Sequence, residues 1–248
     1  MTQLSDAVFT ARRLVAEEFG QARAAWLGGS VAAGNVTPGS DLDITVLLRG
    51  RPAPFRDSRE YEQWPVELFV HTKTSLEHYR RKDRERRQPT IMRLVGESVV
   101  LVDVDGSAVR LQENCAAEVL AGPDALSPDE LASRRYAVTD LQTDLESSRS
   151  PQESTAIASS LWLQAADLLL TGSRHWTGGG KWLLRELEAY DGRHGSSYAA
   201  SLVDGLRAAT TGAVVPLATT CDDILDKFGG RLFAGHRLNG EARDAHPG

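Results

Sequence analysis

The sequence predicts an α+β fold, in which a small mixed β-sheet is flanked by helices and followed by an all-α helical bundle. Two observations support this prediction. Short apolar runs of strand length recur within the first hundred or so residues of the 248-residue chain. After residue 105, long segments with helix-capping signals replace them. We therefore expect two domains, residues 1–105 and residues 106–248, with a poorly ordered tail at residues 235–248.

The first domain is predicted to begin with an amphipathic helix within residues 1–20. Charged residues interrupt its apolar pattern, whereas a secretion signal needs an uninterrupted apolar stretch. No apolar run in the sequence is long enough to cross a bilayer. We therefore expect a cytoplasmic protein. The apolar residues at helical spacing are Leu4, Val8, Ala11, Val15 and Phe19.

Strands and helices are expected where their characteristic patterns occur. The apolar runs typical of strands lie at residues 24–27, 41–48, 64–71 and 98–103. Two helices of the second domain begin at Ser-Pro-x-Glu segments, in which serine is the cap and proline the first helical residue. The helices of this domain are predicted at residues 128–147, 151–171, 181–190, 197–210 and 216–228.

Two aspartates enter the predicted strand at residues 41–48. Because Asp41 and Asp43 are two residues apart, both carboxylates project to one face, whereas Leu42 and Ile44 point to the other. Two adjacent carboxylates repel each other unless protons or cations compensate their charge. Mg²⁺ prefers oxygen ligands, and the pair therefore predicts a magnesium site.

A turn of Gly28, Gly29 and Ser30 follows the first predicted strand, and a helix is expected to begin near Ser30. Such a turn can present backbone N–H groups and a hydroxyl to phosphate oxygens, with the positive end of the helix dipole behind them. Taken alone, these residues are also typical of an ordinary strand-to-helix turn. Their combination with the aspartates favours a phosphate site.

A third acidic residue, Glu67, interrupts the apolar run at residues 64–71. A carboxylate is rarely buried without a partner. Glu67 therefore either completes a triad with Asp41 and Asp43 or faces solvent on an edge strand. We expect the triad, because the other two acids are present.

In their order and spacing, these residues resemble the motif of the nucleotidyltransferase superfamily that shares the DNA polymerase β catalytic core. The elements that match are Gly29-Ser30, Gly34, Ser40-Asp41-Leu42-Asp43 and Glu67. The resemblance covers roughly the first hundred residues. The size and the helical second half look most similar to the bacterial aminoglycoside and lincosamide nucleotidyltransferases. The resemblance implies an α/β-type catalytic domain, followed by a helical domain that binds substrate or nucleotide.

The resemblance also implies roles for individual residues. Asp41, Asp43 and Glu67 would be catalytic and would hold two Mg²⁺ ions, with Glu67 acting either as a metal ligand or as the general base. ATP would be the nucleotide donor. The residues that would bind the nucleotide are Gly28, Gly29, Ser30, Ser40 and Lys181.

Two further segments carry cations or aromatic rings. Six basic residues crowd residues 80–87, where they could clamp a triphosphate, but a solvated helix face of mixed charge is favoured. Lys181 is chosen by resemblance of position, because related enzymes use a lysine of the helical domain; an exposed lysine after a flexible loop is the alternative. Trp182 is expected in the core, with stacking on a base or an acceptor ring as the alternative.

Composition narrows the class of partner. The formal net charge is −6, from 28 Lys+Arg and 34 Asp+Glu. This balance argues against a nucleic-acid binder and suits a cationic small substrate. Cys115 and Cys221 are too few for a disulfide framework and lack metal-ligand spacing, so we expect ordinary thiols.

Three functions compete. The expected one is Mg²⁺-dependent transfer of AMP from ATP to a hydroxyl of a small, aminoglycoside-like antibiotic bound between the domains, with release of pyrophosphate. The alternatives are the same chemistry on a protein or RNA acceptor, and a non-catalytic interaction module of the toxin–antitoxin type. The three carboxylates favour an enzyme, and the sequence leaves its oligomeric state open. Acids that could meet a polyamine-like acceptor, although each is individually typical of a surface, are Asp140, Asp144, Glu186 and Glu188.

Overall fold

The computed structural model describes residues 3–37 and 39–237. The chain divides into two compact units, Met1–Pro123 and Asp124–Gly248. The boundary falls after Pro123 and not after residue 105, because helix α5 (Ser107–Ala121) packs against the sheet of the first unit. Residues 238–248 of the expected tail lie outside the described residues.

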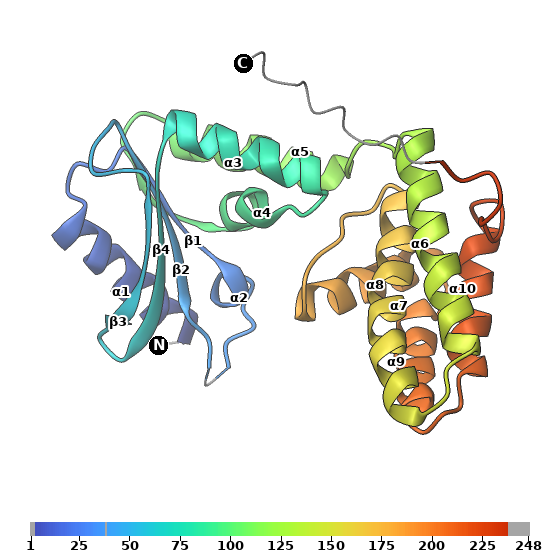
Figure 1. Ribbon diagram of the computed structural model, residues 1–248. Helices are drawn as coiled ribbons and strands as arrows, with labels where there is room; N and C mark the ends of the chain where they lie inside the picture. Colours follow the sequence, from blue (N-terminus) through green and yellow to red (C-terminus); the bar gives the residue numbers. More distant parts are fainter. Residues whose placement is uncertain (1–2, 38, 238–248) are drawn as a thin grey trace, which may run out of the picture. The chain divides into compact units, whose positions relative to one another are not determined.

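One five-stranded mixed sheet lies in the first unit, which confirms the predicted α+β class (Figure 1). Its order is β3-β4-β2-β1-β5, with β2 and β4 parallel and the other pairs antiparallel. The sequence pattern predicts four of these strands and misses β3, whose residues are mostly polar because it is an edge strand with no buried side chain. The strands are β1 (Ala24–Gly28), β2 (Leu42–Leu48), β3 (Phe55–Tyr61), β4 (Trp64–Thr72) and β5 (Val99–Asp103).

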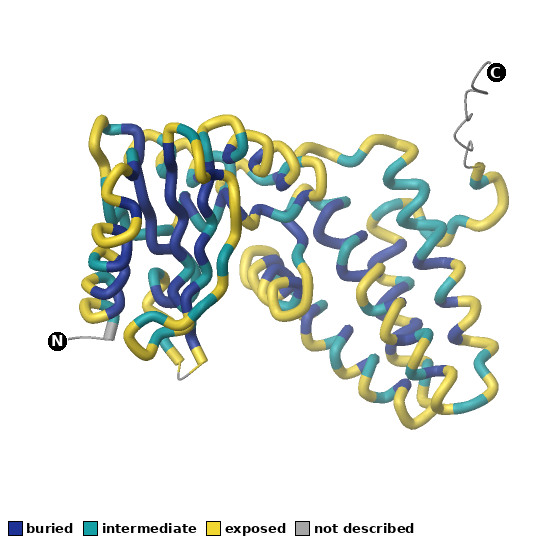
Figure 2. The backbone as a smooth tube through the Cα atoms, turned by 60° about the vertical axis from the view of Figure 1, so that its left-hand side comes forward, coloured by how far each residue is buried: buried dark blue, intermediate teal, exposed yellow. Residues whose placement is uncertain are grey.

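Helices cover both faces of this sheet (Figure 1). Helix α1 (Gln3–Glu18) packs its apolar side on the face that includes Ile44 and Leu68. Helices α3 (Lys73–Arg86), α4 (Thr90–Gly96) and α5 lie on the other face, where the indole Nε1 of Trp26 donates a 3.3 Å hydrogen bond to the Ala108 carbonyl. The central strands form a buried layer between the helices (Figure 2).

A histidine near the end of β4 is buried in this layer. His71 is 6% exposed, and its Nδ1 lies 3.2 Å from Oγ of Ser75. Burial lowers the pKa of His71 to about 4. The ring is therefore uncharged at neutral pH.

We expect His71 to make the first unit sensitive to acid. Its folded-state pKa lies below the ordinary value, so the unfolded chain takes up the proton first as the pH falls. The stabilising contribution is complete above pH 6.5 and is lost as the pH falls through about 4, by up to about 3 kcal/mol. Urea unfolding at neutral pH and near pH 4.5 should show a larger loss of unfolding free energy in the wild type than in His71→Asn.

The comparison between these two proteins isolates His71. The asparagine amide keeps a polar partner near Ser75 but does not titrate. Burial raises the pKa of Asp83 to about 6, which gives an opposite pH dependence, but this group is present in both proteins and cancels in the difference. An equal loss of stability in wild type and variant would contradict the assignment.

The second unit is built from helices that pack around a continuous apolar core. Each begins within one residue of its predicted start. The hydroxyls of Ser127 and Ser150 accept hydrogen bonds from the backbone N–H of Glu130 and Glu153, respectively, as the capping signals predict. Among the described residues, none of the helices has the length and apolar character needed to span a bilayer. The helices are α6 (Pro128–Glu146), α7 (Pro151–Gly172), α8 (Lys181–His194), α9 (Tyr198–Ala209) and α10 (Val215–Asp226).

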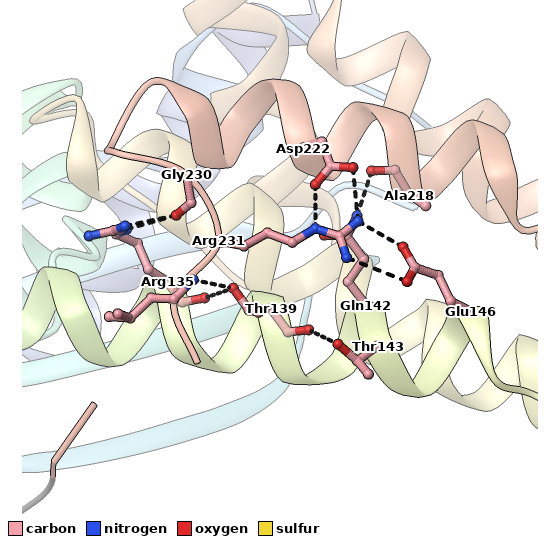
Figure 3. A network of polar contacts seen from close by, with 10 residues as sticks. Arg135, Thr139, Gln142, Thr143, Glu146, Ala218, Asp222, Gly230 and Arg231 are labelled. Carbon is pink, nitrogen blue, oxygen red and sulfur yellow. Dashed lines mark hydrogen bonds and ion pairs between the residues drawn. The ribbon is translucent and has the colours of Figure 1, made fainter. Parts of the chain in front are cut away.

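A polar network fastens the segment after α10 to α6 and α10 (Figure 3). The guanidinium of Arg231 donates to both carboxylate oxygens of Asp222, at 2.7 and 2.9 Å, and to Oε1 of Glu146 at 2.7 Å. The bond from Arg231 holds the pKa of Asp222 below its ordinary value. On α6, Arg135 donates to the Gly230 carbonyl at 2.8 Å. The segment at Gly230 and Arg231 is therefore held to α6 and α10 by paired charges and by a hydrogen bond to the backbone.

Both cysteines are free and buried, one in each unit. Burial raises the pKa of the Cys115 thiol to about 11 and that of Cys221 to about 12. Both thiols therefore stay protonated at neutral pH, as expected for ordinary core residues.

Candidate active site

Three carboxylates meet near the starts of the two parallel strands. Asp43 of β2 and Glu67 of β4 are register partners, and Asp41 immediately precedes β2. One ligand oxygen of each residue lies within 4.8 Å of those of the other two. All three side chains belong to partly exposed residues. The parallel pairing of β2 and β4 therefore assembles the triad expected from the sequence.

The Gly28–Gly29 turn is packed against this triad too closely for a side chain. A Cβ added to Gly29 would lie 1.9 Å from Oδ2 of Asp43, and Gly29 has a φ of +70°. A Cβ on Gly28 would lie 2.7 Å from the carbonyl oxygen of Leu94 in α4. Both positions therefore require glycine, which brings the backbone of the turn directly beside a carboxylate of the triad.

The helix that follows the turn is shorter than expected. Helix α2 (Gly29–Ala32) is a single turn of four residues, closed by a hydrogen bond from the Ala33 N–H to the Gly29 carbonyl at 3.2 Å. A helix macrodipole is the sum of many aligned peptide dipoles, and α2 contains only one turn. The helix dipole that the sequence predicted behind a phosphate site is therefore not present. What the turn offers instead is the backbone N–H groups of a first helical turn and the partly exposed Ser30.

Ser40 stabilises the loop between the turn and β2. Its hydroxyl accepts a 2.8 Å hydrogen bond from the Thr37 N–H and lies 3.4 Å from Oγ of Ser30. The residue is only 6% exposed. Ser40 thus ties the loop to Ser30, and this local bonding explains why a small hydroxyl residue precedes the aspartates.

Helix α4, which the sequence analysis missed, supports the turn from behind. The buried carboxylate of Asp83 accepts hydrogen bonds from the N–H groups of Ile91 and Met92, at 2.6 and 3.1 Å, and so satisfies the first turn of α4. Arg86 adds an ion pair at 3.1 Å. Because α4 carries Leu94, which packs against Gly28, Asp83 is linked to the glycine turn through this helix.

An arginine on the edge strand is a second residue that sequence reasoning missed. Nη2 of Arg56 in β3 donates to Oε2 of Glu67 at 2.7 Å. Its Cζ lies 4.9 Å from the ring centroid of Phe69, the register partner of Arg56 in β4. No motif marks Arg56, because its proximity to the triad depends on the β3–β4 hairpin.

The basic residues at 80–87 form ion pairs mainly with acidic residues of α3 itself and of the neighbouring helix α5. Arg80 and Arg84 pair with Glu77 of α3 and with Glu118 of α5. Together with the Arg86 pair described above, these contacts support the mixed-charge interpretation of residues 80–87 rather than a phosphate clamp.

The remaining predicted site residues belong to the second unit. Lys181 is exposed at the start of α8 and follows Gly180, which has a φ of +54°. Trp182 is 40% exposed, with the Arg185 guanidinium 4.9 Å from its ring centroid, so the expectation of a core indole is wrong. The buried side of α8 is formed by residues such as Leu183 and Leu187 and does not include Trp182.

The four acids proposed for a cationic acceptor differ in exposure. Asp140, Asp144 and Glu188 are exposed, whereas Glu186 is only 8% exposed. The first three therefore remain available to solvent on the second unit, and Glu186 belongs to its interior rather than to its surface.

Comparison with known families agrees with the geometry of the first unit. Residues 10–89 match the family model described as a nucleotidyltransferase domain. This stretch contains β1 to β4, the glycine turn and all three carboxylates of the triad. The match supports nucleotidyl transfer in general, and with it a nucleotide substrate. No curated protein matches the chain.

Among solved structures, a similar one is the nucleotidyltransferase-like protein from Exiguobacterium sibiricum 255-15. It shares 9% sequence identity with this chain and has a TM-score of 0.45, over 88% of this chain and 74% of that chain. A likeness at this level carries no weight for function.

Proposed function

We propose that the chain is a Mg²⁺-dependent adenylyltransferase that transfers AMP from ATP to a hydroxyl of a small molecule and releases pyrophosphate. The observation that carries this proposal is the carboxylate triad on adjacent parallel strands, with the backbone of a glycine turn packed against it. The family match over residues 10–89 supports the general chemistry. The proposal goes beyond this general chemistry in naming ATP as the donor, Mg²⁺ as the metal and a small-molecule hydroxyl as the acceptor.

The residues of the triad fit a divalent cation. Three carboxylates whose oxygens lie within 4.8 Å of one another offer hard ligands and an excess of negative charge. When bound there, one or two Mg²⁺ ions would neutralise charge on the triphosphate and lower the pKa of the acceptor hydroxyl. Asp41, immediately before β2, and Asp43 in β2 would hold the metal together with Glu67 of β4.

Glu67 has two candidate roles, as a metal ligand or as the general base that takes the acceptor proton. Its closeness to both aspartates favours the ligand role. In the reaction, the acceptor oxygen forms a bond to the α-phosphorus, and the bond between that phosphorus and the pyrophosphate oxygen breaks. The hydroxyl proton is released to a base or to solvent.

The glycine turn is the proposed site for the β- and γ-phosphates. Backbone N–H groups at Gly28 and Gly29 and the hydroxyl of Ser30 would bind the phosphate oxygens, and the close packing of the turn would fix their positions. We assign Ser40 the role of holding Ser30 in place, given the short distance between their hydroxyls. Lys181 is proposed to reach the nucleotide phosphates by resemblance of position.

A cationic, aminoglycoside-like molecule is the proposed acceptor. The net charge of −6 favours attraction of a cationic substrate. The resemblance to bacterial aminoglycoside and lincosamide nucleotidyltransferases points to the same class. Exposed acids on the second unit, such as Asp140 and Glu188, could contribute to binding its amino groups.

Pyrophosphate release tests the proposed function directly. Each of the four nucleoside triphosphates would be incubated with Mg²⁺ and a panel of aminoglycosides and lincosamides. We expect release from ATP that depends on one of these acceptors and that is lost when Mg²⁺ is chelated. Nucleotide binding without release across the panel would redirect the proposal to a protein, RNA or biosynthetic acceptor.

A further inference from the structure

Arg56 places a positive charge against the acidic triad without belonging to it. Its guanidinium contacts Glu67 at 2.7 Å, and its side chain is 59% exposed, compared with 30% for Glu67. Arg56 reaches Glu67 diagonally, because its direct register partner is Phe69 and that of Glu67 is Ser58. The contact is therefore made by a long side chain that remains largely in solvent.

The ring of Phe69 holds the guanidinium independently of Glu67. Cζ of Arg56 lies 4.9 Å from the ring centroid, within the range of a cation–π contact. The Arg56 side chain can thus stay against the Phe69 ring of β4 when its ion pair with Glu67 is broken. This second contact distinguishes Arg56 from a surface arginine that pairs with one carboxylate only.

A divalent cation and Arg56 would compete for the same carboxylate. A metal held by the triad would bring two positive charges close to the guanidinium, and charges at this separation repel even when partly screened by water. Either Arg56 leaves Glu67 as the metal binds, or both cations remain and the affinity for the metal falls. In both cases Arg56 weakens metal binding.

We propose that Arg56 is a counter-ion of Glu67 in the metal-free protein, and that it lowers the affinity of the triad for divalent cations by competing for this carboxylate. This inference rests on the proposed metal site. Arg56 is a positioning residue in this scheme: it holds the Glu67 carboxylate near the two aspartates and limits their mutual repulsion until a metal replaces it.

Direct measurement of metal binding tests the proposal without relying on turnover. The probe is Mn²⁺, with free ion counted by electron paramagnetic resonance in the full-length protein. Arg56→Met should bind Mn²⁺ about three- to tenfold more tightly than the wild type at low ionic strength, and the difference should shrink in high salt. Arg56→Lys keeps the positive charge and can still lie over the Phe69 ring, so its Mn²⁺ affinity should stay closer to the wild type than that of Arg56→Met.

Arg59 provides a matched control on the same strand. It pairs with Glu18 of α1 and lies opposite Val66, so its side chain faces the other side of the sheet. Arg59→Met removes the same charge from β3 and should leave Mn²⁺ affinity within about twofold of the wild type. Unfolding curves of all variants would verify that the sheet is intact.

Each outcome decides between distinct conclusions. Unchanged or weaker Mn²⁺ binding in Arg56→Met, or an equal gain in Arg59→Met, would overturn the role of Arg56 and leave the proposed function standing. Wild-type binding no stronger than that of an Asp41→Asn/Asp43→Asn protein would remove the metal site, and the inference with it.

Discussion

Replacing Asp41 and Asp43 with asparagine should abolish nucleotidyl transfer, with a loss in kcat/KM of at least about a thousandfold. Asparagine keeps the size of each side chain but removes the negative charge that attracts a divalent cation. Both side chains are partly exposed, so we expect the substitutions to leave the core intact. Acceptor-dependent pyrophosphate release would measure the loss.

The stability of this double variant gives an independent readout. Removing two charges relieves repulsion within the triad and also removes whatever favourable interactions the two carboxylates make, so the metal-free variant should unfold within a few degrees of the wild type. Mg²⁺ should raise the unfolding temperature of the wild type but not that of the variant. Asp57→Asn on β3, which alters an aspartate that pairs with Arg59, serves as the control and should keep activity. Turnover retained by the double variant would refute the metal assignment.

Gly29→Ala should have the second largest effect, with activity falling by at least about a hundredfold and the unfolding free energy by about 1–3 kcal/mol. The new Cβ would lie 1.9 Å from the Asp43 carboxylate, so either the turn or Asp43 must move. A displacement of this size disrupts both the glycine turn, the proposed phosphate site, and the triad. Steady-state kinetics and urea unfolding would measure the two losses separately.

Gly34 offers a matched control for the backbone strain. Its φ of +75° resembles the +70° of Gly29, but a Cβ at Gly34 would have no heavy atom within 4 Å. Gly34→Ala should therefore lose about 1 kcal/mol of stability and keep most of its activity. An equal loss of activity in both variants would show that backbone conformation, and not the collision with Asp43, is responsible.

The residues of the triad could be predicted because their pattern is local. Alternation places Asp41 and Asp43 on one face of a strand and Leu42 and Ile44 on the other. The signals that predict the starts of α6 and α7 are equally local, because each Ser-Pro-x-Glu segment contains the cap, the proline and the glutamate within four residues. For the same reason, Glu67 was recognised as an acid inside an apolar run.

The features that were missed depend on contacts between distant parts of the chain. Arg56 reaches Glu67 only because β3 and β4 form a hairpin in one register. Helix α4 has seven residues and takes its cap from Asp83, which lies in the preceding helix. Exposure of Trp182 depends on which side of α8 packs on the bundle. Sequence patterns contain no direct record of such pairings.

The register of β2 against β4 links the site to the folding of the sheet. Asp43 and Glu67 occupy one rung of a pairing that runs from Leu42 and Val66 to Leu48 and Thr72. A slip of one residue would turn Glu67 toward the apolar side of α1 and expose Leu68 in its place. Metal binding at the proposed site would therefore require correctly aligned strands, and uptake of Mn²⁺ during refolding should report when β2 and β4 reach their native register.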